Sequence, residues 1–222
     1  MIDVTLIDRM GSDLTVVNAA RVSFNKKSEW DEDNTLTVSD SNLVSYLASH
    51  KHMSPFGHCF ASFHVKAPIF VARQLVKHKF LRWNEVSRRY VDDKPDWYWP
   101  KDDVWRGRAK DKKQGSEGLI DLKEDEELLD DVVETTEWCR ALYSKLLDKG
   151  VAPEQARMVL PQSTMTEWYW SGSLDAFSDM CKLRRDYDAQ YESRLVANSI
   201  SMDLSTLYPA SWKALLRSQV NE

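Results

Sequence analysis

Basic side chains are concentrated in one short stretch of an otherwise acidic chain. Between Arg73 and Arg89 lie six lysine or arginine residues and a single acid, Glu85, whereas the 222-residue chain has a formal net charge of −5. A local concentration of positive charge in an acidic protein indicates a specific anionic ligand, because a polyanion would favour a basic surface overall. Composition alone also allows a plainer interpretation, a solvated basic face of a helix.

The residue types in this stretch are those that bind a phosphate group. A phosphate is bound by backbone N–H groups, a hydroxyl and at least one guanidinium, whose flat fork matches two oxygens. Ser87, Arg88 and Arg89 offer this set on one turn, while Glu85 can accept from a sugar or base and Gln74 can both donate and accept. These residues are therefore suited to hold the phosphate of a nucleotide monophosphate.

Metal and thiol chemistry are less well supported. Three histidines surround the segment Pro55-Phe56-Gly57, but no acid or cysteine completes a ligand set at metal-binding spacing, and the segment is typical of a turn. We expect no metal. The three cysteines, Cys59, Cys139 and Cys181, show no CxxC spacing, so we expect a reducing compartment and no zinc site. We expect Ser87 to bind rather than attack, because its neighbours are basic.

The order of the basic stretch resembles the signature of the flavin-dependent thymidylate synthases. That family has Arg-His-Arg, seven residues and then Ser, in a pattern that ends Ser-x-Arg-Tyr. This chain has Lys77-His78-Lys79, seven residues and then Ser87-Arg88-Arg89-Tyr90, with Asn84-Glu85 between them. Other segments that resemble the family are residues 19–24, 52–58, 63–74, 156–161 and 183–190. By inspection the resemblance covers about residues 13–90 and 152–192.

The resemblance implies a reaction and its participants. In that family dUMP is reductively methylated to dTMP; methylenetetrahydrofolate supplies the carbon, FAD reduced by NADPH supplies the hydride, and no cysteine nucleophile is used. The implied dUMP-binding residues are Gln74, Lys77, Glu85, Ser87, Arg88, Arg89, Arg157 and Arg184. The implied catalytic residues are Arg184, Ser87 and His78, with Arg184 against the pyrimidine carbonyls as negative charge develops.

The match to the family's FAD-binding residues is less complete. The implied positions are Ser23, His52, Ser54, Lys77, His78, Lys79, Ser173 and Asp179. Lys77 and Lys79 keep the charge of the family's arginines and lose the bidentate fork. Gly57 stands where the family commonly has Glu, and Ser173 and Asp179 where it often has Asn near the adenine. The dUMP half of the site is therefore the better matched half.

The hydrophobic periodicity predicts an α+β fold, in which helices flank a small antiparallel sheet in a single domain over residues 1–222. Strands are expected around Val4 and Leu6 and over residues 59–66 and 164–170. Helices are expected after an N-cap at Asp13, from Ser39 or Asp40 to Ser49, from Pro68, over about 120–148, from Pro153, after a cap at Ser173, over 186–207 and around Trp212. Residues 92–127, aromatic and then highly charged, predict an extended mobile loop of the kind that often binds ligands.

The resemblance also implies a homotetramer whose sites are formed by several subunits. The apolar stripe of the helix at 120–148 would serve either as core or as a subunit contact. No stretch suits a membrane span or a secretory signal, so we expect a cytoplasmic protein without a membrane partner.

One rival class remains, a non-enzymatic nucleotide- or nucleic-acid-binding protein that has kept the basic loop and lost flavin. Aromatic and basic residues within 92–127 could stack on single-stranded nucleic acid. The acids that follow, at 124–127 and 130–131, would repel a phosphate chain, so we do not expect a nucleic-acid partner.

Overall fold

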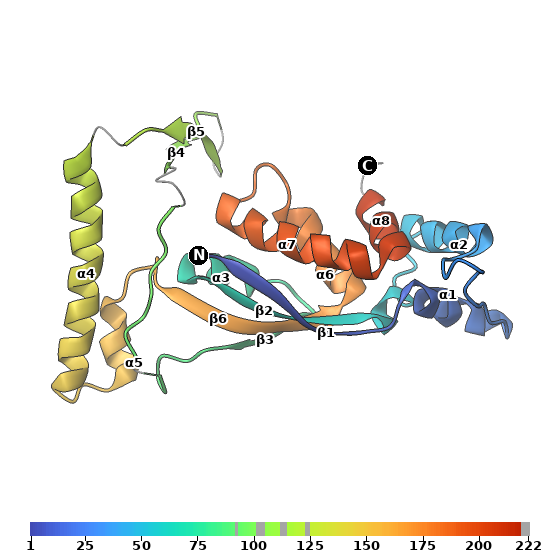
Figure 1. Ribbon diagram of the computed structural model, residues 1–222, viewed down its shortest axis with the longest axis horizontal. Helices are drawn as coiled ribbons and strands as arrows, with labels where there is room; N and C mark the ends of the chain where they lie inside the picture. The colour runs from blue at the N-terminus through green and yellow to red at the C-terminus, as the bar shows by residue number, and fades with distance from the viewer. Residues whose placement is uncertain (92, 101–104, 112–114, 123–124, 219–222) are drawn as a thin grey trace.

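A four-stranded antiparallel sheet lies at the centre of the molecule, with the strand order β1-β2-β6-β3 (Figure 1). The computed structural model describes residues 1–91, 93–100, 105–111, 115–122 and 125–218. The strands of the sheet are β1 (Asp3–Met10), β2 (Phe60–Pro68), β6 (Met165–Ser173) and β3 (Arg82–Glu85). The predicted α+β class with a small antiparallel sheet is confirmed.

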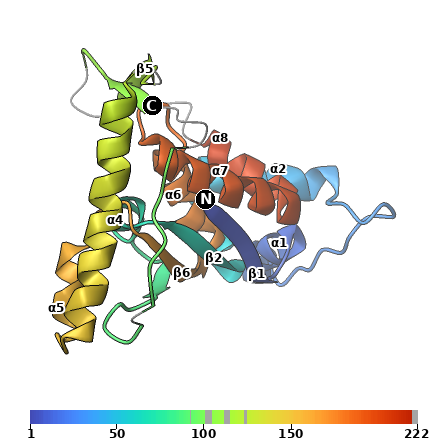
Figure 2. The ribbon, with the colours of Figure 1, turned by 60° about the vertical axis from the view of Figure 1, so that its left-hand side comes forward.

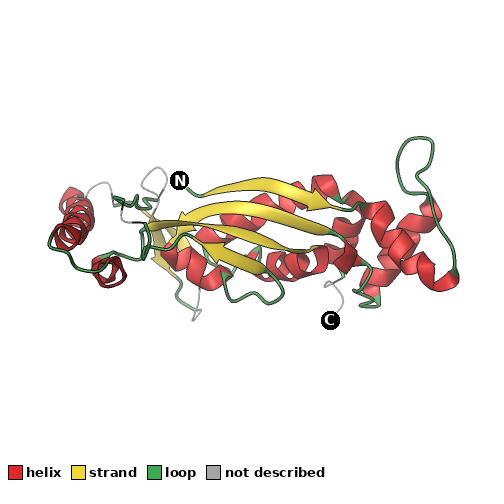
Figure 3. Ribbon diagram, turned by 90° about the horizontal axis from the view of Figure 1, so that it is seen from below, coloured by secondary structure: helices red, strands yellow, loops and turns green. Residues whose placement is uncertain are grey.

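Helices cover one face of the sheet and leave the other face open (Figure 3). The covering helices are α3 (Ile69–Leu75), α6 (Leu174–Arg184) and α7 (Tyr191–Leu207). Alternate side chains of β2 are buried, among them Phe63 and Val65, and Phe63 meets Phe177 of α6 edge to face, with ring centroids 5.3 Å apart. The open face is polar, for example where the hydroxyls of Ser62 and Ser171 lie 2.8 Å apart.

The first and last helices meet at one end of the sheet. The elements here are α1 (Asp13–Arg21), η1 (Val22–Phe24), α2 (Val38–Ser49), η2 (Phe56–His58) and α8 (Pro209–Arg217). Asp13 was predicted as the N-cap of α1, but Ser12 holds that position. The buried carboxylate of Asp13 instead accepts hydrogen bonds of 2.9 Å from the backbone N–H groups of Ala210 and Ser211, so it caps α8 from a distant part of the chain.

The opposite end of the molecule carries α4 (Glu126–Asp148), α5 (Pro153–Ala156) and η4 (Arg157–Val159) (Figures 1 and 2). The long helix was predicted to begin near Ile120; it begins at Glu126, because the carboxylate of Asp125 accepts from the backbone N–H of Leu128 at 3.2 Å and so caps it. Of its 23 residues only Thr136 and Tyr143 are buried. The apolar stripe of α4 is thus largely uncovered in a single chain.

The span 92–127, predicted as a mobile loop, contains a two-stranded antiparallel sheet of β4 (Trp105–Arg108) and β5 (Ser116–Ile120). Part of this prediction, at residues 92, 101–104, 112–114 and 123–124, lies outside the described residues. Among the helices of the described ranges, none has the length and hydropathy that crossing a membrane requires.

Two more helix predictions need correction. α7 begins at Tyr191 and not at Asp186, because the Asp186 carbonyl and carboxylate accept from the backbone of Ala189 and Asp188 and form a turn. The helix predicted from Pro68 begins at Ile69, since Pro68 still belongs to β2. Its buried residues are Val71, Ala72 and Leu75, whereas Val76, predicted to be inward, is 47% exposed.

The signature stretch contains a strand that periodicity did not indicate. β3 is the edge strand of the sheet, and Arg82 to Glu85 pair with Ser171 to Trp168 of β6. Just before it, Phe80 has a positive φ of 67°, and Leu81 is packed against β6 at Gly172. A Cβ at position 172 would lie 2.4 Å from Leu81 Cδ2 and 3.3 Å from the Phe80 carbonyl oxygen. The close approach of residues 80–81 to β6 therefore favours glycine at 172.

Gly172→Ala should consequently destabilise the protein by about 1–3 kcal/mol, the usual cost of overpacking a well-packed site. Thermal unfolding checks this, with Gly57→Ala as the matched control, because a Cβ at position 57 meets no atom within 4 Å. Equal melting temperatures for Gly172→Ala and wild type would contradict the argument.

Candidate functional site

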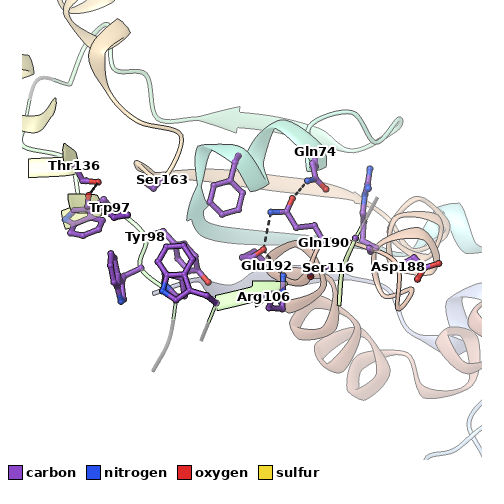
Figure 4. Close-up of a pocket in the computed structure, with 18 of the residues that line it drawn as sticks. Gln74, Trp97, Tyr98, Arg106, Ser116, Thr136, Ser163, Asp188, Gln190 and Glu192 are labelled. Carbon is purple, nitrogen blue, oxygen red and sulfur yellow. Dashed lines mark hydrogen bonds and ion pairs between the residues drawn. The ribbon is translucent and has the colours of Figure 1, made fainter. Parts of the chain in front are cut away.

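A cavity of about 790 Å³ lies between the C-terminal end of α3, the segment 97–100, β4 and the turn before α7 (Figure 4). Three of the residues predicted to bind the nucleotide line it, namely Gln74, Lys77 and Arg184. They come from segments more than 100 residues apart in the chain. The tertiary structure therefore assembles a cationic, hydrogen-bonding wall that no single motif contains.

Arg184 and His78 form a direct contact at this wall. Nε of Arg184 donates to Nε2 of His78 at 2.9 Å. Burial, together with the neighbouring charge of Arg184, lowers the pKa of His78 to about 4, so the ring is neutral at physiological pH. Because Nε2 accepts, the ring proton lies on Nδ1. Among the described residues, the terminal nitrogens of Arg184 have no protein acceptor, which leaves them available to a ligand.

Both the nitrogen and the oxygen of the Gln74 side-chain amide form hydrogen bonds with other side chains. Its Nε2 donates to Oε1 of Gln190, and its Oε1 accepts from the hydroxyl of Ser193 at 3.3 Å. Ser193 is fully buried, and Gln190 also lines the cavity. Neither residue was singled out from the sequence, although Gln190 lies within a segment that resembled the family.

The predicted phosphate turn does form, but it does not line the cavity of its own chain. The backbone N–H of Tyr90 donates to the Ser87 carbonyl at 2.9 Å, and Nε of Arg89 lies 3.4 Å from Oγ of Ser87. Arg88 differs from Arg89, because its guanidinium donates to the carboxylate and the carbonyl of Asp93. Ser87 and Arg89 are therefore the members of the turn with capacity for an anion.

Glu85 and Arg157 also lie away from the cavity. The carboxylate of Glu85 accepts from the hydroxyl of Thr166 at 2.7 Å and from the indole N–H of Trp83 at 3.1 Å. Arg157 is exposed on η4, beside α4, and its Nε donates to the Glu154 carbonyl. Of the eight predicted dUMP residues, the fold brings together only the three that line the cavity.

The predicted FAD residues outside the signature stretch gather near the other end of the sheet. Phe60 pairs with Ser173, and the backbone N–H of Leu174 donates to the Cys59 carbonyl at 2.9 Å, which places the loop with His52 and Ser54 beside the start of α6. Ser23 follows α1 at the same end. Lys79, like Lys77, is exposed. None of the predicted FAD residues outside the signature stretch lines the cavity of the same chain.

The start of α6 fits the adenosine and diphosphate groups of FAD. Oδ1 of Asp175 is buried and has no hydrogen-bond partner among the described residues, so it can accept from an adenine amino group or a ribose hydroxyl. The hydroxyl of Ser173 makes no cap hydrogen bond. Lys182, whose Nζ lies 3.8 Å from Asp179, supplies a cation for phosphate. Burial raises the pKa of Asp179, whose carboxylate is paired with Lys182.

Several cavity residues were not named from the sequence. Arg106 on β4 pairs with Glu192 at 3.5 Å, and the Arg106 guanidinium lies over the ring of Tyr191, 4.3 Å from its centre. Burial, with the charge of Glu192, raises the pKa of Tyr98 to about 12. The only signal in the sequence was the aromatic run 97–99, which was interpreted as part of a binding loop and does line the cavity.

Thiol and metal chemistry find no support at the cavity. Cys59 follows His58 directly in the chain, yet burial, with the nearby charge of Asp13, raises the pKa of its thiol to about 12, and burial also raises that of Cys181. Neither lines the cavity. Within the described ranges, no three His, Cys, Asp or Glu side chains are grouped to hold a metal ion. The His50 ring instead stacks on Tyr46, with centroids 3.9 Å apart.

Comparison with known proteins identifies relatives along nearly the whole chain. The family described as "Thymidylate synthase complementing protein" matches residues 5–210. A flavin-dependent thymidylate synthase of Thermus thermophilus is 42% identical over 212 residues, which are 95% of this chain and 74% of the relative. One from Thermosipho melanesiensis is 37% identical over 96% of this chain and 89% of its own. The structure of a UMP/dUMP methylase from Streptomyces cacaoi, bound with 5-Br dUMP, aligns with a TM-score of 0.84 and 30% identity over 98% of this chain and 95% of that one.

The neutral state of His78 can be tested by titration. We expect an NMR pKa of about 4 in the wild type and a value closer to 6.5 in Arg184→Met, where the neighbouring charge is removed and burial remains. Since the folded pKa lies below the unfolded one, the stability that this histidine contributes is present above pH 6.5 and is lost as the pH falls toward 4.

Arg185→Met is the matched control, because Arg185 donates to Asn198 and does not contact His78. A His78 that titrates near 6.5 in the wild type would contradict the assignment of a neutral ring beside Arg184.

Proposed function

Because the chain belongs to the thymidylate synthase complementing protein family, we propose that its cavity is the pyrimidine side of a thymidylate synthase site. The protein is a flavin-dependent thymidylate synthase that methylates dUMP reductively to dTMP. Methylenetetrahydrofolate and NADPH are its co-substrates and FAD is its cofactor. The observation that carries the assignment to the cavity is the convergence of Gln74, Lys77 and Arg184 around the bond between Arg184 and His78.

Arg184 is the residue best placed to polarise the pyrimidine. A guanidinium whose terminal nitrogens have no protein acceptor can donate to a uracil carbonyl and stabilise the negative charge that develops on its oxygen. Neutral His78 orients that guanidinium and does not neutralise its positive charge. Lys77 adds a second cation at the same wall. FAD, when bound, supplies the hydride that completes the methyl group, and the side chains orient and polarise the substrate.

The phosphate turn is proposed to act in the cavity of another subunit. Ser87 and Arg89 form an anion-binding turn that does not line the cavity of its own chain, and Glu85 and Arg157 likewise lie outside it. Sharing between subunits would combine these residues with Gln74, Lys77 and Arg184. In the same way, the adenosine side of FAD would be held by Ser23, His52, Ser54, Ser173 and Asp179. The reacting ring of the same FAD would lie near three residues of a neighbouring subunit, Lys77, His78 and Lys79.

The homotetramer is supported by the surface of α4. Its exposed apolar side chains include Trp138 at 65% and Leu128 at 43%, on a helix with two buried residues. A helix of this length needs a partner for its apolar stripe. We also propose that residues 92–127 are mobile. We further propose a cytoplasmic location, because the cysteines are free, as is usual in a reducing compartment.

A non-enzymatic nucleotide-binding protein is the disfavoured alternative. It gives no reason for a half-buried, neutral histidine to hold an arginine toward the cavity. Purified protein that is yellow, and that forms dTMP from dUMP with FAD, NADPH and methylenetetrahydrofolate, supports the enzyme. Colourless protein that binds dUMP and forms no product after FAD is added would favour the alternative.

Sharing of sites can be tested by subunit complementation. Arg184→Ala and Ser87→Ala should each be inactive, and an exchanged equal mixture should recover about a quarter of wild-type activity, because one random subunit pairing in four restores both residues to a site. The control is Arg184→Ala mixed with Gln74→Ala: both residues line the same cavity of one chain, so this mixture should not exceed the mean of the two separate activities. Absence of recovery in the first mixture, after exchange has been verified, would refute a shared site.

A mechanism without a cysteine nucleophile predicts that the cysteines are dispensable. Replacing Cys59, Cys139 and Cys181 together by Ala should lower the melting temperature, because Cys59 and Cys181 are buried, and should leave dTMP formation measurable. Activity is compared below the melting temperature of the variant. A folded variant that binds dUMP and makes no dTMP would restore the case for a thiolate.

A further inference from the structure

A line of polar side chains runs from the β4–β5 hairpin to Gln74. Arg106 on β4 contacts the Glu192 carboxylate at 3.5 Å, and Nε2 of Gln190 donates to Oε2 of Glu192 at 3.1 Å. Gln190 accepts from Gln74 through its Oε1, and Gln74 accepts from Ser193. Figure 4 shows the central part of this line, from Gln74 through Gln190 to Glu192.

The chemistry of Glu192 sets the direction of every hydrogen bond in the line. The side chains of Arg106 and Glu192 are only 19% and 14% exposed, and a carboxylate paired with a guanidinium can only accept hydrogen bonds. Gln190 must turn its amino group toward Glu192, so it presents its carbonyl to Gln74. Gln74 must then present its own amino group to Gln190.

The hydrogen bond from Ser193 fits the same orientation of the Gln74 amide. Its hydroxyl is fully buried and lies 3.3 Å from Oε1 of Gln74, so the Gln74 carbonyl is engaged with protein. One N–H of Gln74 is engaged with Gln190. Within the described part of the chain, the second N–H has no protein acceptor, and the residue lines the cavity. Gln74 can thus offer the cavity its second N–H as a donor.

We propose that Glu192, Gln190 and Ser193 are positioning residues that fix the amide of Gln74 so that it donates an N–H to an acceptor oxygen of the bound nucleotide. The inference rests on the proposed function, which places dUMP in this cavity. The acceptor is either a pyrimidine carbonyl oxygen or a phosphate oxygen, since each can accept a hydrogen bond from the Gln74 N–H. Arg106 contributes from the hairpin by holding the Glu192 carboxylate in place.

The decisive experiment is a double-mutant cycle on dUMP affinity, measured by titration calorimetry with the FAD-reconstituted protein. Glu192→Gln can donate as well as accept, so both amides become free to turn. We expect about fivefold weaker dUMP binding in Glu192→Gln, the net contribution of one hydrogen bond. In the Gln74→Ala background the same change should weaken binding by less than about twofold, because the residue that it orients is gone.

Two further variants guard against a purely structural effect. Ser193→Ala removes only the hydroxyl that engages the Gln74 carbonyl, and it should show the same dependence on Gln74, so the inference stays testable if Glu192→Gln does not fold. Glu137→Gln is the matched control, because it removes a carboxylate paired with Arg140 that does not line the cavity. It should leave the affinity unchanged.

The nature of the acceptor is read from deoxyuridine, which lacks the phosphate. If the acceptor is a pyrimidine carbonyl, Gln74→Ala weakens deoxyuridine and dUMP equally; if it is a phosphate oxygen, only dUMP is weakened. Equal losses in both backgrounds of the cycle, or no loss in Glu192→Gln and Ser193→Ala, would overturn the inference and leave the proposed function standing. A wild-type protein that does not bind dUMP would overturn both.

Discussion

The antiparallel pairing of β2 with β6 is the constraint on which the site depends. These strands are separated by about a hundred residues in the chain, yet they pair without interruption from Phe60 opposite Ser173 to Pro68 opposite Met165. α3 continues from the Pro68 end of one strand, and α6 returns along the sheet from the Ser173 end of the other. Because alternate residues of a strand face opposite sides, a register slip by one residue would turn the buried face of β2 outward and separate His78 from Arg184.

The cationic groups of the site differ in how the protein engages them. The guanidinium of Arg88 is neutralised by Asp93, and that of Arg106 by Glu192. Arg184 is different, because its protein partner is a neutral imidazole, which orients the group and leaves its charge for a ligand. A carboxylate in the place of His78 would hold the same geometry and cancel that charge. The local environment therefore distinguishes Arg88 and Arg106, whose charges are neutralised by carboxylates, from Arg184, whose charge is left for a ligand.

The two halves of the expected site lie apart along the sheet, and the long α4 exposes apolar side chains such as Trp138. Both features follow if the chain is one part of a larger assembly, since residues that do not meet within a subunit can meet between subunits. The start of α6 shows how this chain could accommodate its departures from the family pattern. Asp175 offers an acceptor to the adenosine, and Lys182 lies beside Asp179 to offset its charge.

The sequence by itself determined the family, the antiparallel α+β class and most of the helices, because these depend on local patterns: the Lys77-to-Tyr90 signature, the alternation along residues 59–66 and the period of α4. It did not reveal that Asp13 caps α8, that residues 82–85 form an edge strand, or that Gln74 is hydrogen-bonded to Gln190 and Ser193. Each of these depends on a partner that is remote in the chain or on an edge position with little burial to shape its pattern. The signature predicted which residues bind the substrate. Only the tertiary structure decided which of these side chains share a cavity, because contacts between remote segments produce no periodic pattern in the sequence.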